Sequence, residues 1–265
     1  MTEKCPKCGK KFSSEKSLDQ HLEDYNHSKD AKPNLSMSDR LMNSNLVGIG
    51  ILVLILSGGA FMLASAVTGQ GSADAVNEEI NNNNEPFLGS EDAEVTVAYF
   101  GDYNCSSCLI FEQNVFPGFE DQLLDNGEVK FVKKNFPVVT HQSPDAAQAS
   151  RSVWNQVNET DQELFWEWHE HIYNHQEGYG SNWATRDRIV QLTSQIDGLD
   201  AEKVREDMEQ ETYDEQVQRN LDEGRAVGVR GTPTFVVYNE LTGESEQLVG
   251  PQPLTEFETA IENVR

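Results

Sequence analysis

The sequence predicts a C-terminal α/β domain with a helical insertion, preceded by one transmembrane helix and a small ββα module. Three observations predict this organisation. Two Cys and two His lie close together at the N-terminus, an uncharged run of 22 residues follows, and a strand pattern then breaks into Cys105-x-x-Cys108 before a helical pattern. A chain of 265 residues is long enough for these parts and one sizeable core.

The first 30 residues have the Cys and His spacing of a structural zinc site. The ligands would be Cys5, Cys8, His21 and His27, in the pattern C-x2-C-x12-H-x5-H. This spacing suits a hairpin with two thiolates and a helix with two imidazoles, which close a tetrahedral site around Zn2+. The segment resembles the Cys-Cys-His-His zinc finger family, with Phe12 and Leu18 at its two core positions. We expect folding to depend on the metal, and a disordered tail is the alternative.

Charge around this module disfavours nucleic acid as its ligand. The residues at the family's base-contacting positions are Ser14, Ser17 and Gln20, and the acidic residues around them are Glu15, Asp19, Glu23 and Asp24. Acidic side chains repel phosphates, and a single finger offers little contact area for specific binding. We therefore expect a cytoplasmic protein partner or a regulatory role, with residues 31–45 as a linker.

Residues 46–67 predict a membrane span. They form a run of 22 residues without a charge, about 33 Å long as a helix, which matches a hydrocarbon core of about 30 Å. A buried core helix is disfavoured because nothing in the flanking sequence could pack around it. A cleavable signal peptide, with Ala64-Ser65-Ala66 as the cleavage site, would have a charged region far shorter than the 45 residues found here. We favour a retained anchor.

The flanking charges predict the orientation of this span. Residues 1–45 contain eight Lys and Arg, including Arg40 close to the span, and residues 68–129 contain none. By the positive-inside rule, the N-terminus faces the cytoplasm and the C-terminal domain is extracytoplasmic. Redox chemistry agrees, because zinc-bound thiolates persist in a reducing cytoplasm whereas disulfide exchange has its substrates mainly in an oxidising compartment.

Acidic residues dominate the chain beyond the span. Residues 68–265 contain 38 Asp and Glu and 12 Lys and Arg, so they carry a charge of −26 and the whole chain −25. Self-repulsion of this size destabilises a folded domain unless salt screens it. The composition resembles that of haloarchaeal, extremely halophilic proteins; a domain for cationic partners would instead cluster its acidic residues, which are dispersed here. Residues 68–85 are polar and Asn-rich, which predicts a flexible linker.

Cys105 and Cys108 lie where an alternating apolar pattern gives way to a helical one. At the N-terminal end of a helix, unpaired N–H groups and the positive end of the dipole stabilise a thiolate, so Cys105 is the expected nucleophile. Cys108, one turn later, can resolve a mixed disulfide. The same spacing is also half of a zinc site, so the motif alone leaves both interpretations open.

The pair Thr232-Pro233 stands far downstream, at the entrance of an apolar strand pattern. Strands are expected at about 94–101, 129–135, 233–238 and 246–249, and helices at about 144–157, 161–174, 185–196, 200–223 and 253–263. With both motifs, residues 86–265 resemble the thioredoxin superfamily and, through a helical insert at about 140–225, its DsbA-like branch.

The resemblance implies a thioredoxin fold in which a cis Thr232-Pro233 bond faces Cys105 and Cys108 and positions the substrate chain. It implies a thiol–disulfide oxidoreductase that acts on protein cysteines, needs no organic cofactor and is recycled by a redox partner of unknown identity. The rival function is a membrane-anchored interaction or signalling module, in which the zinc finger binds a cytoplasmic partner. Such a scaffold would have little use for both cysteines.

The sequence departs from the family at one position of the site. A buried carboxylate commonly lies six residues before the first cysteine, where it assists proton transfer, and here that residue is Tyr99. Asp102 is a candidate substitute, and a solvated loop aspartate is the alternative. Ser106 and Ser107 replace the Pro-His pair of strong oxidants, so the direction of catalysis stays open.

The remaining histidines give weaker signals. His169, His171 and His175 could form a metal cluster, but the neighbouring Trp166, Trp168 and Ile172 favour a packed helix face. His141 follows a Phe-Pro turn and is expected either near the rim of the site or in an exposed loop.

Overall fold

The structure, a computed structural model, describes residues 3–4, 11–12, 76, 79–124, 127–178 and 181–265. The chain divides into two compact units, Met1–Gly69 and Gln70–Arg265. In the first unit, strands β1 (Glu3–Lys4) and β2 (Lys11–Phe12) pair antiparallel. The expected zinc ligands Cys5, Cys8, His21 and His27 and the expected span at 46–67 lie outside the described residues, so both stay predictions. No helix within the described ranges is long and apolar enough to cross a membrane.

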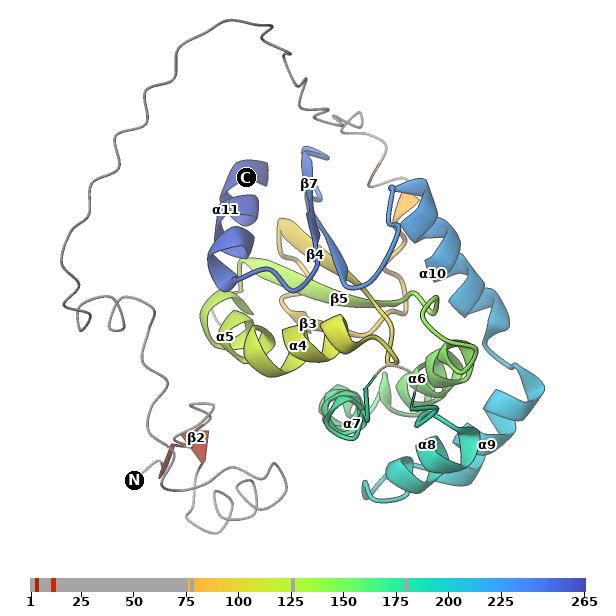
Figure 1. Cartoon of the computed structure of the whole chain (residues 1–265). Helices are drawn as coiled ribbons and strands as arrows, with labels where there is room; N and C mark the ends of the chain where they lie inside the picture. The colour runs from red at the N-terminus through yellow and green to blue at the C-terminus, as the bar shows by residue number, and fades with distance from the viewer. Residues whose placement is uncertain (1–2, 5–10, 13–75, 77–78, 125–126, 179–180) are drawn as a thin grey trace, which may run out of the picture. The chain divides into compact units, whose positions relative to one another are not determined.

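The second unit is built on a five-stranded sheet with the order β3-β5-β4-β6-β7 (Figure 1). Its strands are β3 (Phe87–Gly89), β4 (Val95–Gly101), β5 (Val129–Asn135), β6 (Thr234–Asn239) and β7 (Ser245–Val249). Strands β4 and β5 are parallel, and the other neighbours are antiparallel. The central strands are buried along their length because both faces of the sheet are covered, which explains their near-continuous apolar pattern.

Aromatic side chains fill one face of the sheet. Tyr99, Phe131 and Phe235 from the central strands pack against Phe111 of α4 (Ser106–Asn114) and Phe257 of α11 (Leu254–Val264). Between α4 and β5 the chain forms α5 (Phe116–Phe119) and the short π-helix η1 (Glu120–Leu124). The other face carries a smaller apolar cluster. The order of strands and helices is a thioredoxin fold, as the sequence predicts.

A helical insert interrupts this fold between β5 and β6 (Figure 1). Its helices are α6 (Ser143–Val157), α7 (Gln162–Asn174), α8 (Arg186–Thr193), α9 (Ala201–Gln210) and α10 (Asp214–Ala226). The single helix expected over 200–223 is wrong. Glu211 adopts a left-handed conformation with φ of 51°, and the backbone N–H of Tyr213 donates to Gln148 of α6 at 2.9 Å. This tertiary contact turns the chain, and α10 then returns to the sheet.

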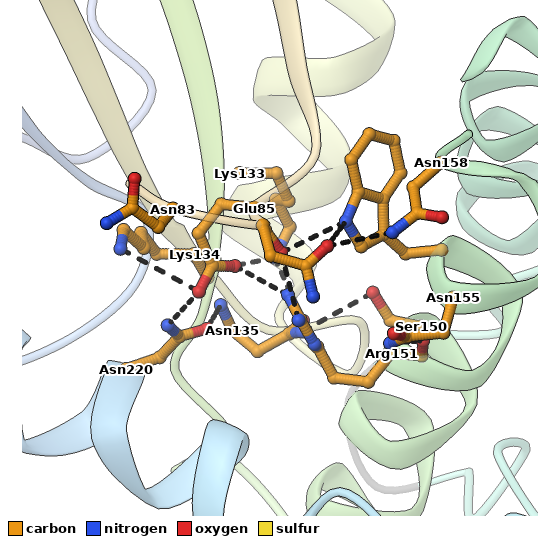
Figure 2. A network of polar contacts seen from close by, with 12 residues as sticks. Asn83, Glu85, Lys133, Lys134, Asn135, Ser150, Arg151, Asn155, Asn158 and Asn220 are labelled. Carbon is orange, nitrogen blue, oxygen red and sulfur yellow. Dashed lines mark hydrogen bonds and ion pairs between the residues drawn. The ribbon is translucent and has the colours of Figure 1, made fainter. Parts of the chain in front are cut away.

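A buried network of charges joins the insert to the sheet (Figure 2). The Glu85 carboxylate accepts hydrogen bonds from Arg151 of α6 and Asn220 of α10, each at 2.8 Å. Lys134 of β5 lies 3.8 Å from Glu85 and pairs with Glu223 of α10 at 2.8 Å. Two carboxylates and two cations thus meet without net charge, which offsets part of the cost of burying them.

We expect Arg151→Met to lower the free energy of unfolding by about 3–5 kcal/mol, because it leaves the Glu85 carboxylate buried with less compensation. Urea unfolding in molar salt, followed by fluorescence, measures this directly, since Trp154, Trp166, Trp168 and Trp183 all lie in the insert. The control Arg225→Met removes an exposed pair with Asp222 and should change stability by less than about 1 kcal/mol. Equal effects of the two substitutions would contradict the role given to this network.

Candidate redox site

The two cysteines occupy the first turn of α4, directly after the central strand β4. Cys105 is the N-cap residue, with extended backbone angles of φ −87° and ψ 116°, and Cys108 lies inside the helix. Both are free thiols; Cys105 retains 7 % exposure and Cys108 none. The structure therefore describes a buried dithiol in which Cys105 keeps a small exposed fraction and Cys108 keeps none.

Thr232 and Pro233 lie against this pair. The Thr232-Pro233 bond is cis, and Cys105 Sγ donates a hydrogen bond to the carbonyl oxygen of Thr232 at 3.2 Å. Pro233 leads directly into β6, the neighbour of β4 in the sheet. The sheet thus brings together two motifs that are 127 residues apart in the sequence.

The environment of Cys105 favours its thiolate. A hydrogen bond from the Cys108 thiol is the largest cause, and the Thr232 side chain and the backbone N–H groups of Cys108 and Ser107 add to it. Burial opposes these contacts, and the pKa of Cys105 falls to about 6. At pH 7 such a thiol is roughly nine-tenths ionised, whereas an ordinary cysteine with a pKa of about 8.5 is a few per cent ionised.

Cys108 has the opposite character. Burial raises the pKa of its thiol well above the usual range, and its neighbour Cys105 raises it further. The backbone N–H of Asp102 and the hydroxyl of Tyr99 partly offset this. The pair is therefore asymmetric, with one reactive thiolate that is supported by one protonated donor.

Asp102 is buried, with 2 % exposure, so its interpretation as a solvated loop aspartate is wrong. Its Oδ1 accepts from the backbone N–H of Asn104 at 2.8 Å, and its Oδ2 accepts from those of Val138 and Val139, both at 2.9 Å. Burial raises the pKa of this carboxyl, while these N–H groups oppose the rise. Asp102 therefore ties the cysteine loop to the turn after β5.

At the position of the family carboxylate, Tyr99 is fully buried. Its hydroxyl lies 3.2 Å from that of Tyr173 in the insert. A side chain at residue 101 would overlap the Tyr99 ring, since a Cβ there would come within 2.5 Å of it, so Gly101 is required. The sequence identifies Tyr99 as the residue at this position, but it does not predict the contact of Tyr99 with Tyr173 in the insert.

Lys133 of β5 is a site residue that sequence reasoning missed. Its Nζ lies 5.3 Å from the centroid of the Tyr99 ring and 5.1 Å from that of Tyr103. It donates to the carbonyl of Lys134 and to Asn135 Oδ1, and within the described part of the chain no carboxylate forms an ion pair with it. Burial lowers the pKa of this ammonium to about 8. The feature that could have identified Lys133 is the presence of a lysine within β5, a strand that is buried on both faces.

The histidines of α7 do not share one site. His169 is buried in the packed face of the helix, as the sequence favours, with Nδ1 2.8 Å from the Tyr103 hydroxyl and Nε2 3.1 Å from Glu112 Oε1. The rings of His171 and His175 lie 4.3 Å apart. No group of three or more His, Cys, Asp or Glu that could hold a metal occurs in the ranges that the structure describes. His141 is in an exposed loop.

Comparison with known proteins gives concordant matches. The sequence model of the family described as Thioredoxin matches residues 81–263. Disulfide bond formation protein D of Bacillus subtilis is 33% identical over 174 residues, which cover 66% of this chain and 76% of that protein. A probable disulfide bond formation protein D of Bacillus cereus is 27% identical, with 77% and 91% covered.

Solved structures agree with these relatives. The crystal structure of oxidised BdbD from Bacillus subtilis is 30% identical and superposes with a TM-score of 0.61, covering 69% of this chain and 94% of that one. Chlamydia trachomatis DsbA, at 23% identity and a TM-score of 0.59, covers 71% and 94% and shares the fold.

We expect alkylation of Cys105 by iodoacetamide to rise with pH through a midpoint near 6, because the thiolate is the reacting species. Mass spectrometry of the peptide that contains Cys105 separates this signal from the N-terminal cysteines. Cys108→Ala should move the midpoint upward, since it removes the largest cause of the lowered pKa. A midpoint between about 8 and 9 in the unaltered protein would contradict the environment described here.

Proposed function

Because the chain belongs to the thioredoxin family and is a DsbA-like thiol–disulfide oxidoreductase, we propose that it introduces disulfides into extracytoplasmic proteins through Cys105 and Cys108. The observation that carries this proposal is the asymmetric pair at the start of α4, in which Cys105 is slightly exposed and contacts Thr232 whereas Cys108 is fully buried. The rival function as an interaction module depends on the zinc finger, whose expected ligands lie outside the described residues.

The proposed reaction starts from a disulfide between Cys105 and Cys108. A substrate thiolate attacks Cys105 Sγ, the bond between the two cysteines breaks, and Cys108 leaves as a thiolate that takes up a proton. A second substrate thiolate then attacks the substrate sulfur of the mixed disulfide and releases Cys105 as a thiolate. The substrate loses two electrons and the cysteine pair gains them, so a separate oxidant must restore the disulfide. No organic cofactor is needed for these steps.

Oxidation of the substrate is the proposed direction for two reasons. A lowered pKa makes Cys105 a good leaving group in the second step and stabilises the reduced protein at any pH above about 6. A stabilised reduced form makes the disulfide more oxidising. Moreover, the relatives from Bacillus subtilis and Bacillus cereus are named for disulfide bond formation.

Thr232 and Pro233 are the proposed positioning residues for the substrate chain. The backbone carbonyl of Thr232 lies within hydrogen-bond distance of Cys105 Sγ, so a substrate strand that reaches this sulfur also passes that backbone. In the thiol form this carbonyl accepts from Sγ. When Cys105 Sγ is bonded to a substrate sulfur, it no longer has a proton to donate. The backbone carbonyl of Thr232 is then available to accept a hydrogen bond from the substrate chain.

The remaining parts of the proposal rest on the sequence. Residues 46–67 would anchor the protein in the membrane with the redox domain outside, and a zinc-bound finger at Cys5, Cys8, His21 and His27 would face the cytoplasm and a protein partner there. The charge of −26 on residues 68–265 suits a saline exterior, where salt screens self-repulsion.

We expect the reduced or oxidised full chain to catalyse thiol–disulfide exchange in molar salt. In the reducing direction, Cys105→Ser should abolish exchange because the attacking sulfur is lost, whereas Cys108→Ser should accumulate mixed disulfides because Cys108 no longer displaces the substrate sulfur from Cys105. Reduction of a disulfide-containing protein and trapping on non-reducing gels measure both effects. Full activity in the double Ser variant would disprove the assignment of the site.

Protease protection in intact cells tests the proposed topology. We expect an added protease to digest the redox domain and to spare residues 1–45, because the basic flank precedes the span. Epitope tags at the two ends report each side independently, and lysed cells serve as the control in which both tags are lost. Loss of the N-terminal tag alone would reverse the orientation.

A further inference from the structure

One face of α7 in the insert holds the loop that leads into Cys105. His169, Tyr173 and the following Gln176 are spaced by four and three residues, which places them along one side of a helix and its end. His169 contacts the side chain of Tyr103 at 2.8 Å, and the Tyr173 hydroxyl donates to the carbonyl of Asp102 at 3.3 Å. The insert thus contacts the segment immediately before the reactive cysteine.

Gln176 makes the contacts nearest to the reacting atoms. Its Nε2 donates to the carbonyl oxygen of Tyr103 at 2.6 Å and to that of Cys105 at 3.3 Å. Two carbonyl acceptors require the NH2 side of the amide, so they fix its orientation. The Oε1 atom is then buried without a hydrogen-bond partner among the described residues, a cost that the two donor contacts have to offset.

These carbonyls lie next to the thiolate in the chain. The Cys105 carbonyl also accepts the hydrogen bond from the Leu109 N–H at 3.1 Å that closes the first turn of α4. Carbonyl oxygens carry partial negative charge, and a thiolate beside them is disfavoured unless donors offset that charge. An amide NH2 that donates to both carbonyls supplies such donors and holds the first turn of α4 in place.

We propose that Gln176 is a positioning residue of the redox reaction, which fixes the Tyr103–Cys105 backbone and offsets its carbonyl charge so that Cys105 stays reactive. This inference rests on the proposed role of Cys105 as the attacked and attacking sulfur. It gives the helical insert a direct part in setting the reactivity of the site, in addition to covering it. Within the described residues, Gln176 is the insert side chain that hydrogen-bonds to the Cys105 backbone.

The test compares three variants of the full chain in molar salt. Gln176→Leu removes the donors, and Gln176→Glu keeps the shape but replaces the donors by a carboxylate. Gln162→Leu is the matched control, because Gln162 lies at the start of the same helix and donates to the carbonyl of Asn158 at 2.9 Å, away from the cysteines. The measurement is the pH midpoint of Cys105 alkylation, with thermal unfolding recorded alongside.

We expect Gln176→Leu to raise the alkylation midpoint by about 0.5 to 1 pH unit, which reduces the thiolate fraction below the midpoint by roughly three- to tenfold. Gln176→Glu should raise it further through its added negative charge, and Gln162→Leu should leave it unchanged. Gln176→Glu also keeps the test valid if the Leu variant fails to fold, since it is nearly isosteric.

Three results would overturn the inference: an unchanged midpoint in both Gln176 variants, a lower unfolding temperature without a change of midpoint, or an equal rise in Gln162→Leu. Failure of the proposed function looks different. If Cys105 is not the reactive sulfur, the unaltered protein itself shows an ordinary midpoint, whereas failure of this inference leaves its midpoint low and unaffected by residue 176.

Discussion

The hydrogen bond between the Cys108 thiol and the Cys105 thiolate is the interaction on which the rest of the site depends. It stabilises Cys105 only while Cys108 keeps its proton, and Cys108 keeps that proton because it is buried beneath the first turn of α4. The aromatic core around Tyr99 and Phe111 provides this burial. The core of the thioredoxin fold is therefore also the cause of the asymmetry between the two sulfurs.

The insert is held to the thioredoxin fold at two places with different chemistry. On one side, the charges of Glu85, Arg151, Lys134 and Glu223 cancel in a buried network and fix α6 and α10 to β5. On the other, Tyr173 of α7 and Gln176, which follows the end of that helix, contact the cysteine loop through neutral hydrogen bonds. The charged network is stable only if all of its charges are paired. The neutral hydrogen bonds hold the cysteine loop without placing a further full charge beside Cys105. This division suits a site whose reactivity depends on a single thiolate.

Local patterns predicted the parts of this fold that are fixed locally. The strand before Cys105 and the strand that follows Pro233 were predicted from alternation and proline chemistry, and the structure has them within about two residues. The helical pattern at the cysteine motif was predicted without bounds and is α4. The break at Glu211 was not predictable in this way, because a side chain 65 residues away takes the backbone N–H of Tyr213. The burial of Asp102, the contacts of Lys133 and the position of Gln176 likewise depend on the packing of distant segments.

The distribution of charge separates the stability of the domain from the chemistry of its site. Of the 12 Lys and Arg in residues 68–265, Lys133, Lys134 and Arg151 are at most 1 % exposed. Glu85, Asp102, Asp207 and Glu223 are buried as well, so burial removes about as many acidic as basic residues and the surface keeps nearly all of the net charge of −26. The self-repulsion of this surface is the contribution that salt screens. Buried pairs are screened much less. Salt should therefore act mainly on whether the domain is folded, while the buried ion pairs and the hydrogen bonds at Cys105 stay nearly constant once it is.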